Sequence, residues 1–307
     1  MTISIIVPCF NEEESLPLFY SEMEKIKFQL NDHFEYIFVN DGSKDRTLQV
    51  LRGLNQVDKS VHYLSFSRNF GKEAALYAGL KHATGDLVTV MDADLQDPPE
   101  LLLTMKSMLE KNPDLDCVGT RRTTRDGEPP IRSFFAKMFY KLINKMGGEL
   151  VYNHADYRLM SKRALKGLLE FDEVNIFLRG MVPMVGYQSD IVTYERAERF
   201  AGESKYPLKK MLSFAFEGIT SLSVKPIKMI FNVGILICII SVLAIIYCLV
   251  RHFTNNTVSG WTSLVMSIWF LGGLQLIAIG MVGQYIGKIY LETKARPKFI
   301  IEQVLND

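Results

Sequence analysis

The stretch VTVMDADLQDPPE, residues 88–100, places Asp92, Asp94 and Gln96 directly after an apolar run. Its last residues predict the start of a helix, because Asp97 can cap a helix that begins with Pro98 and carries a glutamate in the capping-box position. Asp92 and Asp94 are two residues apart, and such side chains point to the same side of an extended chain. The pair therefore either binds a ligand jointly or only caps turns.

The residues before this stretch alternate between short apolar runs and amphipathic segments. The apolar runs are ISIIVP, EYIFVN, VHYLSFS and LVTVMD, and helices are expected near residues 13–30, 46–56 and 72–82. This alternation is the βαβ pattern of an α/β, Rossmann-like fold with a doubly wound, mostly parallel sheet. Ligands of such sheets bind at the carboxyl ends of the strands.

A polar cluster follows each of the four expected strands. The clusters are CFNEEE, NDGSKD, SRNFGK and DADLQD, and all four are expected at the same edge of the sheet. Paired carboxylates with few other protein donors suit a divalent cation that takes its remaining ligands from phosphates and water. The convergence therefore favours a metal site at Asp92 and Asp94 over simple turn capping.

Two long apolar runs occupy the last third of the chain. Residues 229–250 contain one strongly polar residue, Asn232, and residues 261–282 contain one glutamine and no charge. At about 1.5 Å per residue, each helix spans the hydrocarbon core of a bilayer, which is roughly 30 Å thick. Two membrane helices are the simplest interpretation, and a pair of buried core helices is the alternative.

Charged residues around these runs predict the orientation of the chain. Lysines precede the first run, and Lys288, Lys294, Arg296 and Lys298 follow the second, whereas the loop between them holds only Arg251 and His252. By the positive-inside rule, the N-terminal domain and both termini are expected in the cytoplasm. The N-terminus has no signal-peptide pattern, the four cysteines have no metal or disulfide spacing, and a net charge of +1 argues against nucleic acid as a partner.

Two amphipathic segments are expected to lie on the membrane surface. Residues 131–146 place apolar side chains on one helical stripe with basic residues at its edges, and residues 205–228 lead directly into the first apolar run. The alternative for both is an ordinary helix facing the core. The expected organisation is a domain at 1–204, juxtamembrane helices at 205–228, spans at 229–250 and 261–283, an external loop at 251–260 and a cytosolic tail at 284–307.

Several motifs together resemble a known family. They are VPCFNEEE, FVNDGSKDRT, SFSRNFGKEAAL, ATGDLVTVMDADLQDPPE, ADYRLMSKRAL and RFAGESKYPLKKM, followed by two apolar runs and YIGKIYLETKARPKFIIE. In order and spacing, from residue 3 to about 302, they resemble the family 2 polyprenyl-phosphate glycosyltransferases of the GT-A fold. The resemblance is greatest to bactoprenol (undecaprenyl-phosphate) glucosyltransferases and more distant to dolichol-phosphate mannosyltransferases.

The resemblance implies a nucleotide and metal site at the strand ends. It assigns the base and ribose to Pro8, Phe10, Asn11, Glu12 and Asp41, although Asn11 can instead cap a helix with Glu14 in a capping box. The diphosphate falls to Lys72, with Arg68 and Asn69 nearby, and Gly71 either permits close backbone approach or only begins a helix. Asp94 and Gln96 are the expected ligands of Mg²⁺ or Mn²⁺, with Asp92 beside them on the donor side.

The resemblance also implies an acceptor site around Asp156. The expected nucleophile is a lipid monophosphate that is largely ionised at neutral pH, since phosphate monoesters have a second pKa of about 6. Asp156 is therefore expected to position groups and not to act as a simple base. Arg158 either contacts phosphate or pairs with Asp156, and the other phosphate candidates are Arg121 (with Arg122 or Arg125 as alternatives), Arg132, Ser133, Arg199, Ser204 and Lys205.

The expected function is inverting transfer of a hexose, with glucose preferred, from a UDP-sugar to undecaprenyl phosphate at the cytoplasmic face of the inner membrane, for cell-surface glycan modification. Donor alternatives are UDP-linked GlcNAc, GalNAc or galactose, and GDP-mannose. A processive polysaccharide synthase is disfavoured because no Gln-x-x-Arg-Trp motif is present. A catalytically silent sugar-nucleotide-binding scaffold is the alternative of another class, and Gly272, Gly273 and Gly280 allow close helix packing in a homo-oligomer.

Overall fold

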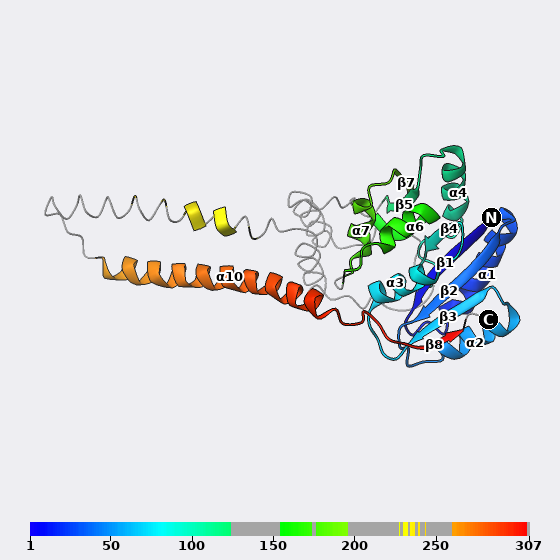
Figure 1. Ribbon diagram of the computed structural model, residues 1–307, viewed down its shortest axis with the longest axis horizontal. Helices are drawn as coiled ribbons and strands as arrows, with labels where there is room; N and C mark the ends of the chain where they lie inside the picture. The colour runs from blue at the N-terminus through cyan, green and yellow to red at the C-terminus, as the bar shows by residue number, and fades with distance from the viewer. Residues whose placement is uncertain are drawn as a thin grey trace.

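The computed structural model describes residues 1–123, 154–173, 176–195 and 260–305, together with isolated positions between 227 and 243. Figure 1 shows an α/β domain from which one long helix, α10, projects, and the chain returns to the domain after that helix. Within these described residues, the domain is built on an eight-stranded sheet in the order β7-β5-β6-β4-β1-β2-β3-β8. The predicted α/β fold is confirmed.

The first half of the sheet follows the predicted βαβ pattern. Its four strands pair in parallel in the order β4-β1-β2-β3, with β1 in the centre. The strands are β1 (Thr2–Cys9), β2 (His33–Asn40), β3 (Val61–Phe66) and β4 (Leu87–Val90), and the helices are α1 (Ser15–Leu30), α2 (Thr47–Val57) and α3 (Lys72–His82). The chain moves from β1 to β3 on one side and then returns to place β4 on the other. The edge between β1 and β4 is therefore a topological switch point, where ligands of such sheets bind.

The second half makes the sheet mixed. Strand β6 (His154–Ser161) runs antiparallel to both β4 and β5 (Cys117–Arg122), and β7 (Ser189–Tyr194) runs parallel to β5. Helix α4 (Leu101–Lys111) precedes β5, while α6 (Lys162–Leu169) and α7 (Leu178–Met184) follow β6. Because β6 lies beside β4, its N-terminal residues reach the edge at which β4 ends.

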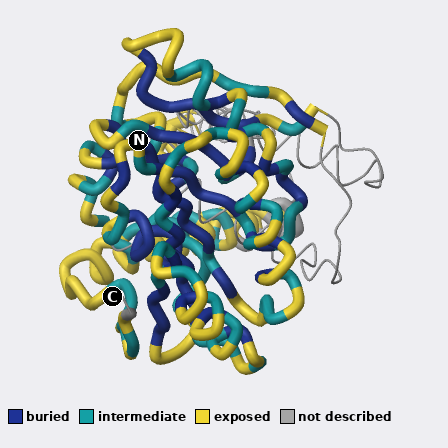
Figure 2. The backbone as a smooth tube through the Cα atoms, turned by 90° about the vertical axis from the view of Figure 1, so that its right-hand side faces the viewer, coloured by how far each residue is buried: buried dark blue, intermediate teal, exposed yellow. Residues whose placement is uncertain are grey.

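Each face of the sheet has its own apolar core. Ile3, Ile5 and Val7 of β1 pack with α1, α2 and α4, whereas Ile6 faces α3, α6 and α7 on the opposite side. Successive strand residues point to opposite faces, so an apolar run such as ISIIV covers both. Figure 2 shows these buried strands inside a shell of more exposed helices and loops. The sheet is thereby a rigid support for the loops at its edge.

Gly79 permits the close approach of α3 to β1. A Cβ at this position would lie 2.3 Å from Cγ2 of Ile6, whereas a Cβ at Gly53 in α2 would meet nothing within 4 Å. We expect Gly79→Ala to lower the free energy of unfolding by about 1–3 kcal/mol, because the packed core must shift. The matched Gly53→Ala variant is expected to raise it by up to about 1 kcal/mol, since alanine favours a helix. Thermal unfolding followed by circular dichroism compares the two, and equal stability of the Gly79→Ala and wild-type proteins would contradict the expectation.

The predicted capping role of Asp97 is wrong. Helix α4 begins at Leu101 with Glu100 as its N-cap residue and no side-chain cap. The buried Asp97 carboxylate instead accepts hydrogen bonds from the Tyr194 hydroxyl and from Nη2 of Arg122, the latter at 3.3 Å. A buried carboxylate needs charged or polar partners, and those partners come from β5 and β7, far along the chain. The cluster ties the DADLQD segment to the end of β5.

Helix α10 (Trp261–Lys294) contains 34 residues and continues beyond residue 283, where the second predicted span ends. Within the described residues, its part Phe270–Lys294 is the one segment long and apolar enough to cross a membrane, with a mean hydropathy of 1.4 and no buried residue in its most apolar stretch. Most of the other predicted span, 229–250, and the two amphipathic segments lie outside the described residues. The two-span arrangement therefore stays a prediction.

The chain after α10 returns to the sheet, which the sequence did not predict. Ala295 ends the helix in the left-handed region, at φ 44°, and Pro297 follows, a residue that cannot continue a helix. Strand β8 (Ile301–Leu305) then pairs antiparallel with β3. The sequence predicted only a cytosolic tail for residues 284–307, whereas the structure places residues 301–305 at the edge of the domain's sheet (Figure 1).

Candidate active site

The carboxyl ends of the four parallel strands bring the predicted polar clusters to one edge of the sheet. Cys9 is level with Asn40, and Asn40 with Ser65, so the loops after β1, β2 and β3 leave the sheet side by side. The segment after β4 leaves next to β1 at the switch point. The convergence predicted from the sequence is confirmed.

The loop after β1 interlocks with the loop after β2. Asn11 has a φ of 56°, its Oδ1 accepts from the main-chain N–H of Lys44 at 2.9 Å, and its own N–H donates to Oγ of Ser43 at 3.0 Å. Glu14 is the N-cap residue of α1 and makes no side-chain cap, so the alternative capping box of Asn11 and Glu14 is wrong. The partners of Asn11 lie 32 and 33 residues away, beyond the reach of a local pattern.

The other base-side candidates surround this interlocked pair of loops. Pro8 is half-buried near the end of β1, and Phe10 exposes 44% of its surface beyond it. The Glu12 carboxylate accepts from the hydroxyl of Ser15, and its N–H donates to Oγ1 of Thr47 at 2.8 Å. An exposed aromatic ring beside a carboxylate can stack on a planar base while the carboxylate accepts from hydroxyls.

Asp41 holds the loop of residues 67–71 through two hydrogen bonds to its main chain. Its Oδ1 accepts from the N–H of Phe70 at 2.6 Å and its Oδ2 from the N–H of Gly71 at 2.9 Å, while burial raises its pKa above the usual value. Gly42, at φ 65°, lets the backbones meet, since a Cβ there would lie 2.4 Å from the carbonyl carbon of Arg68. The structure thus gives Asp41 a loop-holding role, and its predicted contact with a nucleotide stays a prediction.

Lys72 bridges two carboxylates across the mouth of the site, the edge of the sheet at which the four parallel strands end. Its Nζ lies 2.6 Å from Oδ1 of Asp92 and 3.0 Å from Oδ2 of Asp156. Burial lowers the pKa of Lys72, but the two carboxylates outweigh it and hold this pKa above its ordinary value. The sequence predicted Lys72 as a diphosphate ligand, and the structure places its ammonium between Asp92 and Asp156, the residues predicted for the donor and acceptor sides.

Asp156 is surrounded by cations. Nε and Nη2 of Arg179 donate to its Oδ1 at 3.1 and 2.8 Å, and Lys72 contacts its Oδ2. Burial raises the pKa of this carboxyl, but Lys72, Arg179 and Arg158 hold the pKa well below its ordinary range. Asp156 is therefore ionised at neutral pH and is a poor proton acceptor there.

Sequence reasoning missed Arg179 and the residue that orients it. Oε2 of Glu73 accepts from the main-chain N–H of Leu178 at 3.0 Å, which ties the start of α7 to the start of α3. Arg179 follows directly and its guanidinium reaches Asp156. A single arginine within the apolar run IFLRGMVPM was the available signal, because a charge on a short buried segment requires a partner.

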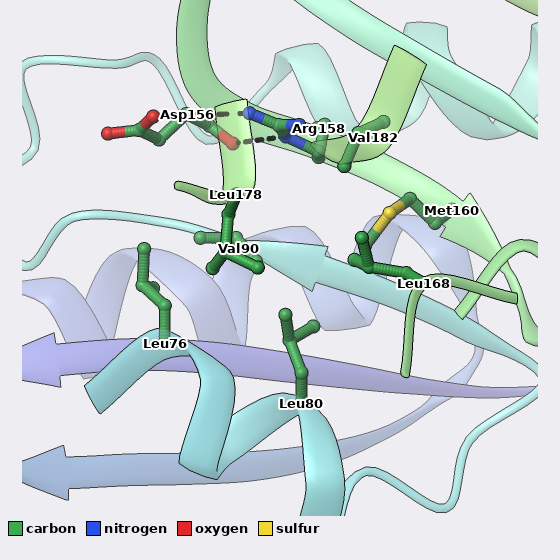
Figure 3. A pocket seen from close by; sticks show the side chains of 9 residues that line it. All are labelled: Leu76, Leu80, Val90, Asp156, Arg158, Met160, Leu168, Leu178 and Val182. Atoms are coloured by element: carbon green, nitrogen blue, oxygen red, sulfur yellow. Dashed lines mark hydrogen bonds and ion pairs between the residues drawn. The ribbon is translucent and has the colours of Figure 1, made fainter. Parts of the chain in front are cut away.

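Arg158 lies beneath Asp156 and is buried, at 3% exposure. Its Nε donates to the main-chain oxygen of Asp156 at 3.0 Å, and its Nη2 lies 3.9 Å from Oδ1 of the same residue. Figure 3 shows its guanidinium over a pocket of apolar side chains, with the Asp156 carboxylate pointing away from them; the apolar lining residues are Leu76, Leu80, Val90, Met160, Leu168, Leu178 and Val182. This geometry favours the ion-pair alternative over direct contact with phosphate.

The segment Asp92–Gln96 offers oxygen donors at the mouth. Leu95 has a φ of 53°, and the N–H of Gln96 donates to Oδ1 of Asp94 at 3.2 Å. Among the described residues, no group of three His, Cys, Asp or Glu side chains is placed to hold a metal ion. The Lys72 ammonium shows that a positive charge is stabilised beside Asp92. Two carboxylates and an amide next to such a position fit a cation that draws further ligands from a phosphate.

The phosphate candidates for the acceptor are only partly described. Arg121 is exposed near the end of β5, level with His154 at the start of β6, while its alternative Arg122 donates to Asp97 and to the hydroxyl of Tyr194. The other candidates lie outside the described residues; they are Arg125, Arg132, Ser133, Arg199, Ser204 and Lys205. Of these two described candidates on the strand next to that of Asp156, Arg121 is the exposed one.

Comparison with known proteins places this site in a family. The profile of glycosyl transferase family 2 matches residues 4–169. The uncharacterized glycosyltransferase YkoT of Bacillus subtilis is 44% identical over 98% of this chain and 91% of its own length, and the bactoprenol glucosyl transferase of Shigella phage SfV is 43% identical over 98% of each.

A solved structure shows the same fold at low identity. Glucosyl-3-phosphoglycerate synthase from Mycobacterium tuberculosis, in complex with Mn²⁺, UDP and phosphoglyceric acid, aligns with a TM-score of 0.51 at 18% identity, over 72% of this chain and 77% of that one. The catalytic domain thus has the predicted GT-A fold. Since the family profile covers over half of the chain and relatives above 40% identity span nearly all of it, this enzyme belongs to glycosyl transferase family 2.

Proposed function

We propose that this glycosyltransferase moves a hexose, glucose by preference, from a UDP-sugar to undecaprenyl phosphate at the cytoplasmic face of the membrane, with inversion. The observation that carries the proposal is the attachment of a membrane-type helix to the edge of the acidic site. Helix α10 ends at Lys294, and five residues later Phe299 stacks on Phe66 at the end of β3. Five residues reach no more than about 18 Å, so the mouth lies close to the end of the anchor.

The donor half of the reaction falls to the strand ends. Asp94 and Gln96, with Asp92 beside them, would hold Mg²⁺ or Mn²⁺, which when bound stabilises the charge that develops on the departing nucleoside diphosphate. Phe10 stacks on the base, and Glu12 and Asp41 face the ribose. Lys72 adds a fixed positive charge at the N-terminus of α3, where the helix dipole also favours phosphate.

The acceptor half requires position more than proton transfer. An ionised lipid phosphate is already a nucleophile, since its second pKa is about 6. Asp156 is kept ionised by Lys72 and Arg179, so it orients these cations and the sugar. The phosphate oxygen attacks C1 of the hexose as the C1–oxygen bond to the diphosphate breaks, and this single displacement inverts the configuration.

The position of β8 supports a topology in which the domain and the chain after α10 lie on one side of the membrane. Strands β3 and β8 are neighbours in one sheet, so residues 61–66 and 301–305 lie on the same side of a bilayer. If α10 crosses the bilayer once, the chain must cross it an odd number of times between residues 195 and 261. The apolar run 229–250 is long enough for one such crossing, and the basic residues that flank both runs support a cytoplasmic location of the domain.

A transfer assay tests the proposal. Membranes containing the full chain are incubated with radiolabelled UDP-glucose, Mg²⁺ or Mn²⁺ and undecaprenyl phosphate, and label is measured in the organic phase. We expect label to accumulate only with all three components, and fastest with UDP-glucose in a panel that includes UDP-GlcNAc, UDP-GalNAc, UDP-galactose and GDP-mannose. No label from any of these donors would support the silent scaffold and end the proposal.

A further inference from the structure

We propose that the C-terminal tail, residues 295–305, holds residues 67–71, the donor loop, in the conformation that binds the nucleotide. Phe299 is the positioning residue for this loop. The proposal rests on the proposed function only for the identity of the nucleotide. No described part of the catalytic chemistry uses the tail, although it belongs to the motif YIGKIYLETKARPKFIIE. Its contacts include β3, which leads into the donor loop, and α3, which follows it.

The tail contacts the donor loop at its first residue and at the aromatic residue before it. The Phe299 ring stacks on the Phe66 ring, with centroids 5.0 Å apart and planes at 11°. The N–H of Ser67 donates to the carbonyl oxygen of Ile300 at 3.1 Å. Phe66 is 2% exposed, so Phe299 supplies part of the surface that buries it.

The donor loop transmits this support to Asp41. The Phe66 ring meets the Phe70 ring edge-on at 5.7 Å, and the guanidinium of Arg68 lies 3.9 Å from the centre of the Phe70 ring. The Phe70 and Gly71 N–H groups donate to the two oxygens of Asp41. Phe70 is thus held between a ring that the tail supports and a carboxylate at the mouth of the site.

The tail also contacts α3, the helix that begins with Lys72. Nζ of Lys298 lies 2.7 Å from Oδ1 of Asp172 and 4.3 Å from the centre of the Tyr77 ring in α3. Tyr77 is fully buried, and its hydroxyl donates to the carbonyl oxygen of Phe171 at 3.3 Å. The start of α3 is therefore supported on one side through the donor loop and on the other through Tyr77.

The contacts have a functional consequence, because a surface loop without packing partners samples many conformations. A donor loop that moves away from Asp41 no longer presents Lys72 and its own N–H groups at one place, and the nucleotide must then provide the ordering free energy when it binds. Removal of the Phe299 ring is therefore expected to weaken donor binding. Among the described residues, the tail's strand pairing and ring stacking fall on β3, whereas the acceptor side is built from β6 and α7.

The test uses full-length protein in lipid nanodiscs and compares two neighbouring tail residues. Phe299→Ala removes the stacked ring, whereas Ile300→Ala changes a side chain that is 55% exposed and keeps the main-chain bond to Ser67. For Phe299→Ala we expect the KM for the UDP-sugar to rise about tenfold, with kcat and the KM for the lipid acceptor within about twofold of wild type. Ile300→Ala is expected to match wild type, and Phe299→Tyr to restore the donor KM.

Amide hydrogen exchange gives a readout that does not depend on the donor. In the ligand-free Phe299→Ala protein, the amides of Phe70 and Gly71 are expected to exchange faster, while those of the central strand β1 keep their protection. Unchanged exchange at Phe70 and Gly71, or an equal effect of Ile300→Ala on the donor KM, would overturn the proposal. If wild type turns over no nucleotide sugar, the proposed function fails, and hydrogen exchange alone still decides the role of the tail.

Discussion

Asp94→Ala enzyme is expected to reach the membrane in normal amount and to transfer hexose about a thousandfold more slowly than wild type. The reason is that the proposed cation loses a carboxylate ligand, and a Lewis-acid metal contributes several kcal/mol to the stabilisation of the departing group. Asp94 is only partly buried at the mouth of the site, where its Oδ1 accepts from the N–H of Gln96. The fold is therefore expected to survive the change.

The matched control is Asp114→Ala, which removes an exposed carboxylate from the turn before β5, at the opposite end of that strand from the site. Initial rates are measured as lipid-linked label at saturating donor, with Mn²⁺ titrated for each protein. We expect Asp114→Ala to match wild type and chelation by EDTA to stop the wild-type reaction until Mg²⁺ or Mn²⁺ is added back. A wild-type rate for Asp94→Ala would remove the basis of the metal site.

Asp156→Asn is expected to lower turnover about a hundredfold, because the change releases Lys72 and Arg179 from one carboxylate and small misplacements of reacting groups have effects of this size. It also removes the carboxylate charge beside the buried Arg158 and beside Arg179, while Lys72 keeps Asp92, so we expect the free energy of unfolding to fall by about 3 kcal/mol. The wild-type and variant rates are compared from pH 6 to pH 8.5 with protein shown to be folded by circular dichroism.

The pH dependence separates positioning from base catalysis. The pKa of Asp156 is held well below its ordinary value, so its deprotonated fraction does not change over this range. We expect the Asn variant to be slower by the same factor at each pH. A deficit that disappears at high pH, where hydroxide can replace a missing base, would instead identify Asp156 as a proton acceptor.

The same shift predicts how this carboxylate affects stability. The pKa of Asp156 is lower in the folded state than in the unfolded state, where an aspartate has a pKa of about 3.9. Its ionisation therefore stabilises the folded protein at any pH above the unfolded-state pKa, and this stabilisation is lost as the pH falls through the folded-state pKa. Ionisation of Asp156 therefore contributes a constant stabilisation at neutral pH and a loss only in acid.

The repeating elements of the fold were predictable because they depend on local patterns. Apolar strands such as IIV, the amphipathic helices between them and the polar residues after each strand are all contiguous in sequence. Parallel pairing then forces the carboxyl ends to one edge. The neighbourhood of Phe10, Asp41, Lys72 and Asp94 follows from these facts without knowledge of the coordinates.

The local capping interpretations failed because the same side chains had stronger distant partners. The sequence offered Asp97 a helix N-terminus within a few residues, but burial against β5 and β7 gave it Arg122 and Tyr194. Asn11 likewise bonds to the loop after β2 and not to α1. Capping boxes compete with any donor that folding brings near, and a local pattern does not contain those donors.

The sequence by itself determined the class of sheet, the edge at which the site forms, the acidic segment of that site and the apolar character of the helix that became α10. Only the tertiary structure decided that Arg179 pairs with Asp156 and that Lys72 contacts two carboxylates. It also decided that the chain after α10 adds an edge strand to the sheet beside β3. The physical reason is the separation along the sequence of the residues that interact. Periodicity and strand direction are properties of adjacent residues, whereas ion pairs and edge-strand pairing join residues 20 to more than 200 positions apart, whose meeting depends on how the whole chain packs.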